Sequence, residues 1–256
     1  MNRQQRQKVN GLPALVFWTA VWYLAALRFD NPLLLPTPVQ VLRCLGGMMA
    51  TVSFWKITCI SICRILLGVS AAVLLGTVLA VLTEKSRWLH LLIAPAMTAM
   101  QATPVASFTI LVLIWLERDY VPVLICGMMG LPLVWNSVSG GIRTTNVQLL
   151  EMAKVYRLSK WCTFRRIWVP SVMPFFRMAC CSALGLGWKA GIAAEVLTVP
   201  RSSIGRMISE SKLYLMTEDL FAWTLAVILC SLIIEKVLMS AIGRLGKAWV
   251  PGGDEV

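Results

Sequence analysis

The sequence predicts an all-α polytopic membrane protein with six transmembrane helices, and three observations predict it. The 256-residue chain is 58% hydrophobic and 14% charged, whereas soluble domains are roughly 45–50% apolar and about 25% charged. Several windows of about 18 or more apolar residues occur, which is roughly the length that crosses a bilayer. These windows are continuously apolar, whereas the strands of a transmembrane β-barrel alternate. We therefore expect membrane-spanning helices and no barrel.

The expected spans cover residues 12–27, 57–82, 89–116, 121–138, 174–197 and 220–242. The first follows a basic start and resembles a signal peptide, but its aromatic residues and the later spans favour a retained helix. The third is long and contains Pro95 and Pro104, so we expect either a kinked helix or a short helix leading into the span. Short amphipathic helices are expected within 38–52 and 198–219. Residues 1–256 form one transmembrane domain.

The distribution of Lys and Arg predicts the orientation. If the N-terminus is cytoplasmic, the inside segments carry fourteen basic residues and the outside segments carry seven. Cytoplasmic loops are enriched in Lys and Arg, so we expect both termini inside. Residues 143–177 then lie in the cytoplasm.

The segment 143–170 is a polar interruption between apolar runs. It contains six basic residues and a single acid, Glu151. Thr144, Thr145 and Asn146 are good N-cap residues, and the following ten residues have helical spacing. Ser159 can cap a second short helix that Pro170 is expected to stop. The sequence thus predicts a helix–turn–helix finger outside the bilayer.

Three ionisable residues stand within predicted spans, namely Arg64, Lys189 and Glu195. Such residues usually face the bundle interior, and all three are candidates for the translocation path. Lys189 is expected to line a translocation path and favour an anion, unless it only pairs between helices or extends to the interface. Glu195 lies nearer the outer end, where a basic partner is expected. Gln101, beside a proline break, is a further candidate for the path or part of a plain kink.

Several functions are disfavoured. No GxxxxGK[ST] loop is present, so the chain has no usual nucleotide site. His90 is the one histidine and is expected to pack at the interface, and no carboxylate pair lies within a span, so no catalytic constellation is expected. The eight cysteines include no CxxC pair, so no metal site or cofactor is expected. The net charge of +12 fits cytoplasmic loops beside anionic lipid and not nucleic-acid binding.

The segment 143–170 resembles the EAA loop of ABC-importer permeases, whose signature is Glu-Ala-Ala, then Gly, then a distant Ile-x-Leu-Pro. Glu151, Met152 and Ala153 stand at its start, and Ile167 and Pro170 are at the later positions. The sequence departs at Met152 and at Arg157, which occupies the glycine position. The resemblance implies that this loop docks on an ATPase subunit. The implied coupling residues are Glu151, Met152, Ala153, Tyr156, Arg157 and Leu158.

Other stretches, including LLLPTPVQVLRCL and ALGLGWKAGIAAEVL, are similar to the nitrate/sulfonate/taurine branch of these permeases. The resemblance implies the type I permease fold, a dimer of permeases and location in the cytoplasmic (inner) membrane. It also implies two ATPase subunits that hold ATP and Mg, and an extracytoplasmic solute-binding protein. The implied function is import of a small anionic solute such as nitrate, a sulfonate or taurine. A vitamin precursor such as a thiamine pyrimidine is an alternative cargo, and an ATP-independent channel or secondary carrier is an alternative class.

Overall fold

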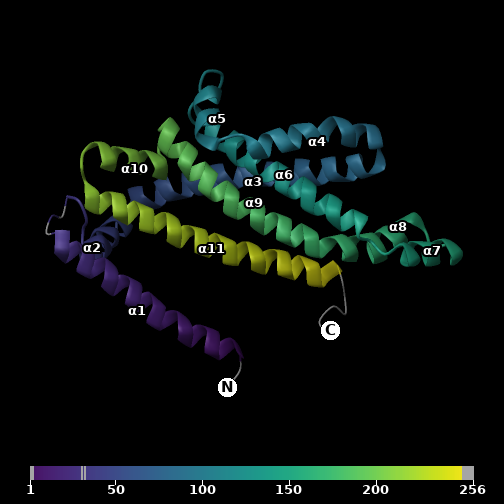
Figure 1. Cartoon of the computed structure of the whole chain (residues 1–256), viewed down its shortest axis with the longest axis horizontal. Helices are drawn as coiled ribbons and strands as arrows, with labels where there is room; N and C mark the ends of the chain where they lie inside the picture. Colours follow the sequence, from purple (N-terminus) through teal and green to yellow (C-terminus); the bar gives the residue numbers. More distant parts are fainter. Residues whose placement is uncertain (1–2, 30, 32, 250–256) are drawn as a thin grey trace.

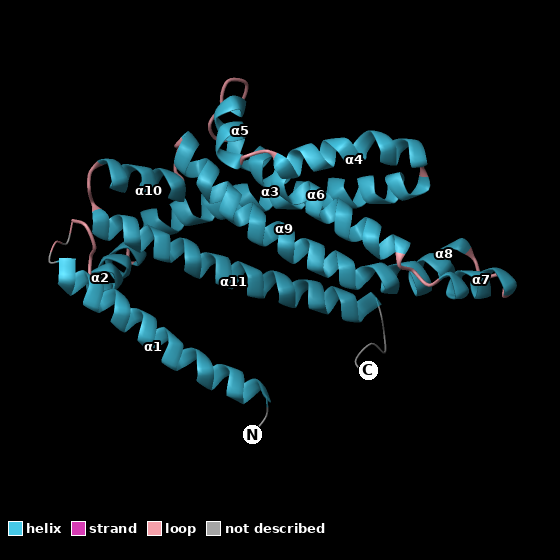
Figure 2. Cartoon of the chain, in the orientation of Figure 1, coloured by secondary structure: helices cyan, strands magenta, loops and turns pink. Residues whose placement is uncertain are grey.

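The computed structural model describes residues 3–29, 31 and 33–249, with side chains for 13–29, 31 and 33–241. Every regular element in this part is helical (Figure 2). The side chains of Arg3, Arg6, Lys8, Arg244 and Lys247, which enter the charge asymmetry, lie outside the described residues, as do those of Leu12 and Ile242 at the ends of the first and sixth predicted spans.

Three long helices form the centre of the bundle. They are α3 (Val52–Lys85), α6 (Val121–Arg143) and α9 (Val169–Thr198), and they run along the long axis of the molecule (Figure 1). Small residues in α3 let its backbone approach α6. A Cβ on Gly68 would meet the backbone of Val123, and one on Gly76 would meet the side chain of Val134. Such close approach is the usual basis of helix association in membranes, where hydrophobic exclusion from water is absent.

Three further helices lie against this centre, namely α2 (Pro38–Met49), α10 (Ile204–Leu213) and α11 (Thr217–Trp249). α1 (Arg3–Phe29) lies outside them and contacts α2. α1 leans away from the bundle toward its start (Figure 1), and near its other end Trp22 stacks on Phe221 of α11 with ring centroids 5.8 Å apart. The predicted surface helices within 38–52 and 198–219 correspond to α2 and α10.

The start of α2 follows directly from its sequence. Thr37 and Gln40 form a reciprocal capping box, with Pro38 in the first turn where its missing N–H costs nothing. The Cys44 thiol of this helix donates to Asp219 Oδ1 of α11 at 3.0 Å. Burial, and then this hydrogen bond to a carboxylate, raises the pKa of Cys44 to about 12, so the thiol stays protonated at neutral pH.

The third predicted span is broken. α4 (Arg87–Ala102) and α5 (Val105–Val112) meet at an angle of 104° across Thr103 and Pro104. The expected kink is therefore confirmed, but the bend is far sharper than a kinked crossing, and the longer helix comes first. Pro104 has no N–H and restricts the residue before it to extended geometry, and Thr103 has ψ 125°.

In the described residues, four helices are long and apolar enough to cross a membrane, and the bent α4–α5 pair would make a fifth. The four include α3, α6 and α11, and α9 with the helical turns before it. The apolar part of α1, Pro13–Phe29, is 17 residues, which is at the short end of the range that spans a bilayer. The chain is thus a multi-pass membrane protein.

The polar segment between α6 and α9 forms two short helical pieces. α7 (Val147–Val155) is followed by α8 (Lys160–Thr163) and by a π-helical turn, η1 (Phe164–Trp168). The expectation that Pro170 stops the second helix is wrong, because helix continues from Lys160 to Thr198. Val169 N–H bonds to Phe164 O in the wider π turn, so the helix passes Pro170, whose missing N–H removes one hydrogen bond inside it.

Candidate functional site

α7 and α8 project beyond the bundle at one end of the molecule (Figure 1); we call residues 144–163 the finger. Its two helices begin at the residues that the sequence indicates. Asn146 Oδ1 accepts from Gln148 N–H at 2.8 Å, and Ser159 Oγ accepts from Cys162 N–H at 3.2 Å. These bonds satisfy backbone donors that otherwise have no partner at a helix start.

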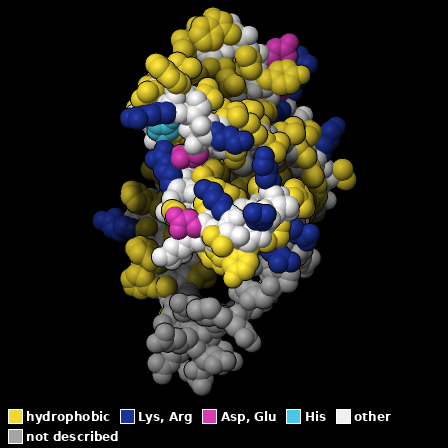
Figure 3. Space-filling view, turned by 90° about the vertical axis from the view of Figure 1, so that its right-hand side faces the viewer, with side chains coloured by type: hydrophobic (Ala, Val, Ile, Leu, Met, Phe, Trp, Pro, Cys, Tyr) yellow, Lys and Arg dark blue, Asp and Glu magenta, His cyan; other side chains and the backbone are white. Residues whose placement is uncertain are grey.

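The surface of the finger mixes exposed apolar and basic side chains. Ala153 is buried, whereas Met152 is 44% exposed and Tyr156 74% exposed. Glu151 is exposed and forms no ion pair within the described part of the chain. Figure 3 views this end of the molecule, where Lys and Arg side chains outnumber the acidic ones among apolar side chains. Exposed apolar side chains of this kind, rimmed by polar ones, are typical of a protein-binding surface.

Arg157 ends α7 in the left-handed region, with φ 49°. Leu158 N–H bonds back to Ala153 O at 2.9 Å, which is the closure of a Schellman-type helix end. That position favours glycine because a Cβ is strained there. The glycine of the EAA signature therefore has a structural explanation at this position, and Arg157 adopts the same conformation at an energetic cost.

Polar contacts connect the ends of α3, α4 and α6 where the bundle meets the finger. Arg143 at the end of α6 bonds to Glu84 Oε1 of α3 at 2.8 Å and approaches His90 Nδ1 of α4 at 3.5 Å. His90 stacks on Trp135 with ring centroids 5.5 Å apart, and the Trp135 indole donates to Thr83 Oγ1. His90 therefore packs against an aromatic ring, and its location at a membrane interface stays a prediction.

At the other end of the bundle, near α10, Arg64 and Glu195 pair with each other. Arg64 Nη1 lies 2.8 Å from Glu195 Oε1, and Arg64 Nη2 lies 3.2 Å from Asp119 Oδ1. Glu195 is fully buried, and its Oε2 also accepts from Ser61 Oγ at 2.8 Å and from Gly205 N–H at 3.2 Å. We call Ser61, Arg64, Asp119 and Glu195 the lock.

The lock joins three helices and one turn. Ser61 and Arg64 belong to α3 and Glu195 to α9, and the backbone of Ile204 in α10 donates to Ser61 Oγ. Asp119, in the turn before α6, is half-exposed and also accepts from Arg201 N–H at 3.0 Å. Beside it lies a polar hollow of 670 Å³, lined by residues that include Arg118 and Arg206. The expected basic partner of Glu195 is therefore Arg64.

The two remaining candidates for the path lie apart from the lock. Gln101 is exposed in the last turn of α4, next to the break, and Lys189 is exposed on α9. Lys189 forms no ion pair with any described residue. It shares its face of α9 with exposed Ser182, Gly185 and Ala193. This face carries small residues and the exposed Leu186 around one cation that forms no ion pair with a described residue, whereas Arg64 and Glu195 neutralise each other.

Asp119 and Ser61 were not singled out from the sequence. Asp119 could have been found, because an unpaired Arg64 in a span requires an acid and a polar turn next to a span can supply one. Ser61 carries no such signal. Within the described side chains, no three His, Cys, Asp or Glu lie together in a way that could hold a metal ion.

Known proteins resemble this chain in sequence and in fold. The taurine transport system permease protein TauC of Escherichia coli is 24% identical over 96% of this chain and 90% of its own. The protein of the same organism named "Putative aliphatic sulfonates transport permease protein SsuC" is 29% identical over 91% of this chain and 88% of its own. A crystal structure of an amino acid ABC transporter with histidines matches with a TM-score of 0.58 at 13% identity, covering 80% of this chain and 97% of that one, and shows a shared fold.

The family profile described as binding-protein-dependent transport system inner membrane component matches residues 72–249. Proteins of this family are the membrane permease components of ABC transporters, and ATP hydrolysis takes place in partner subunits. Because the match covers more than half of the chain, this protein belongs to the family of binding-protein-dependent transport system inner membrane components, as a permease and not an enzyme.

Proposed function

We propose that this chain forms the translocation path of an ABC importer for a small organic anion, with sulfonates as the leading class. The relatives named for taurine and aliphatic sulfonates support the class of solute. The observation that carries the assignment to an ATP-driven importer is the finger, whose apolar and basic surface is exposed at one end of the bundle and has no covering element in the described chain.

In this proposal the finger docks on the ATPase through Glu151 to Leu158. Met152 and Tyr156 are the apolar anchors, since both are exposed and one helical turn apart, and Arg157 provides a charge contact. The root of the finger is tied to α3 and α4 through Arg143. Closure of the ATPase on ATP and Mg would therefore move the ends of several spans together, which is the coupling that alternating access needs.

The proposed importer contains two ATPase subunits and a second copy of the permease, and it lies in the cytoplasmic membrane. Each permease chain has six spans, with both termini in the cytoplasm. The second copy packs on the small-residue face of α9, because Ser182, Gly185 and Ala193 permit close helix approach. Lys189 then faces its symmetry mate at the dimer axis and lines the path with Gln101.

The lock and the polar hollow then lie at the outer end of the path, where an extracytoplasmic binding protein delivers its solute. Arg64 and Glu195 hold the bundle together in this arrangement, because each satisfies the other's charge and Glu195 has no exposed surface for a solute.

Charge reversal in the finger tests the assignment. Glu151→Lys should reduce co-purification of the ATPase and uptake of a labelled sulfonate, while the thermal unfolding temperature of the permease stays unchanged because Glu151 is exposed and unpaired. Lys212→Glu reverses an exposed charge on α10 at the opposite end and is the matched control for association with the ATPase. If Glu151→Lys leaves association, ATPase stimulation and uptake intact, the docking assignment is wrong.

A further inference from the structure

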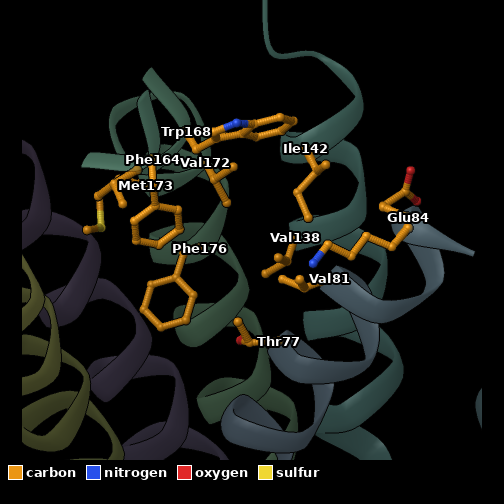
Figure 4. Close-up of a pocket in the computed structure, with 12 residues that line it drawn as sticks. Thr77, Val81, Glu84, Val138, Ile142, Phe164, Trp168, Val172, Met173 and Phe176 are labelled. Carbon is orange, nitrogen blue, oxygen red and sulfur yellow. The ribbon is translucent and has the colours of Figure 1, made fainter. Parts of the chain in front are cut away.

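A cavity of 540 Å³ lies at the root of the finger, between the end of α3, the end of α6 and the start of α9. We call it the root cavity. Figure 4 shows Phe164 and Phe176 on one side of it, facing Val138 and Ile142 on the other, with the Trp168 indole across the top. Its volume is within the range of small-molecule sites, roughly 300–1,000 Å³. It is separate from the lock, from the small-residue face of α9 and from the exposed surface of the finger.

The charges at the root cavity favour an anion at its edge. Two charged residues line it, Glu84 and Lys85. The Glu84 carboxylate is neutralised by Arg143 at 2.8 Å. Lys85 is exposed and forms no ion pair with the described residues, so an unpaired ammonium group remains beside an apolar chamber.

The lining excludes a small hydrated anion as the occupant. Such an ion needs several donors to replace its water. Besides Lys85 the lining offers the Trp168 indole among apolar side chains, because the Thr77 hydroxyl already donates to Val73 O at 2.6 Å. The lining instead fits a ligand that has an apolar body and an anionic group at one end. The cavity lies where three apolar helices pass into a basic segment, and Lys and Trp are residue types enriched at membrane–water interfaces.

We propose that the root cavity holds an acyl chain of an anionic phospholipid from the cytoplasmic leaflet, with the headgroup phosphate at Lys85. The choice of leaflet rests on the proposed orientation of the finger. Because the lining includes η1 and the first turns of α9, a bound chain supports the junction through which the finger moves the bundle. Inside the bilayer such a chain is present at high concentration, so the site needs little intrinsic affinity.

Quenching of tryptophan fluorescence by brominated acyl chains tests the proposal. The permease–ATPase complex is placed in phosphatidylcholine nanodiscs that contain either brominated phosphatidylglycerol or brominated phosphatidylcholine. The signal of Trp168 is the difference between the wild-type protein and Trp168→Phe. Brominated phosphatidylglycerol should quench this signal at about fivefold lower mole fraction than brominated phosphatidylcholine, the preference expected from one lysine beside an anionic headgroup.

Two variants make the result specific. Lys85→Gln should remove the preference for phosphatidylglycerol, whereas Lys56→Gln, an exposed lysine near the start of the same helix, should keep it. Val172→Phe fills the cavity and should remove quenching by both lipids in complexes that still hold their ATPase.

Three results would overturn the site. They are equal quenching by the two lipids in wild-type protein, a preference that survives Lys85→Gln, and quenching by a brominated fatty acid, added to nanodiscs in place of the brominated phospholipid, without quenching by the phospholipid itself. None of these results bears on docking of the finger, which association with the ATPase tests separately.

Discussion

The two ends of the bundle use charged residues in opposite ways. At the finger, Glu151 and Arg157 are exposed, and no ion pair involving Glu151 is found in the described chain. At the lock, Arg64 and Glu195 are buried, and each is held by at least two polar groups. Burial makes an unpaired charge costly, so the lock must keep its partners. Exposure leaves the finger free to exchange water for a partner protein.

The largest expected effect comes from breaking the lock. Glu195→Ala leaves Arg64 buried with half-exposed Asp119 as its one remaining carboxylate. Breaking a buried pair in this way costs about 3–5 kcal/mol. We expect a clearly lower thermal unfolding temperature in detergent and poor recovery of the complex.

A variant that lacks both Arg64 and Glu195 shows whether the lost stability comes from an unpaired buried charge or from lost side-chain packing. The double variant Arg64→Met with Glu195→Ala should recover part of the lost stability, because no lone charge remains. Glu151→Ala is the matched control in the finger and should leave the unfolding temperature within error. A Glu195→Ala protein as stable as the wild type would contradict a structural role for the lock.

An intermediate effect is expected at Lys189, which is exposed like the finger but lies within a predicted span. Lys189→Met should reduce the maximal uptake of an anionic solute, with normal assembly, because the cation that favours an anion in the path is lost. Lys236→Met alters an exposed lysine on α11 and should leave uptake unchanged. Unchanged transport in Lys189→Met would remove this residue from the path.

The sequence predicted most of the helices because hydrophobic length and capping are local properties. Asn146 and Ser159 mark helix starts where the structure has them. It did not predict the 104° bend at Pro104, because the angle depends on what α5 packs against. It also missed the continuation through Pro170, since a π turn has no clear sequence signal.

The lock was only half predictable, because its contacts also depend on how the helices pack. The need of Glu195 for a basic partner can be stated from composition, but the choice of Arg64 depends on how α3 and α9 are placed side by side. Gly205 shows this dependence most directly. A Cβ at this position would collide with the backbone and side chain of Glu195, so the close approach of α10 to α9 requires glycine there, and only the fold reveals it.

The smallest expected effect is at Arg157. A substitution there distinguishes the energetic cost of its left-handed backbone from a contact between its side chain and the ATPase. Arg157→Gly relieves a left-handed residue and should stabilise the end of α7 by about 1 kcal/mol, seen as slower hydrogen exchange at Tyr156 and Leu158. Leu215→Gly is the matched control, because Leu215 has φ 56° at the end of α10 and Met216 N–H bonds back to Ser211 O at 2.9 Å. Both variants should gain local protection. If the Arg157 side chain contacts the ATPase, Arg157→Gly alone weakens association with it despite this gain, whereas equal association in both variants would limit Arg157 to a conformational role.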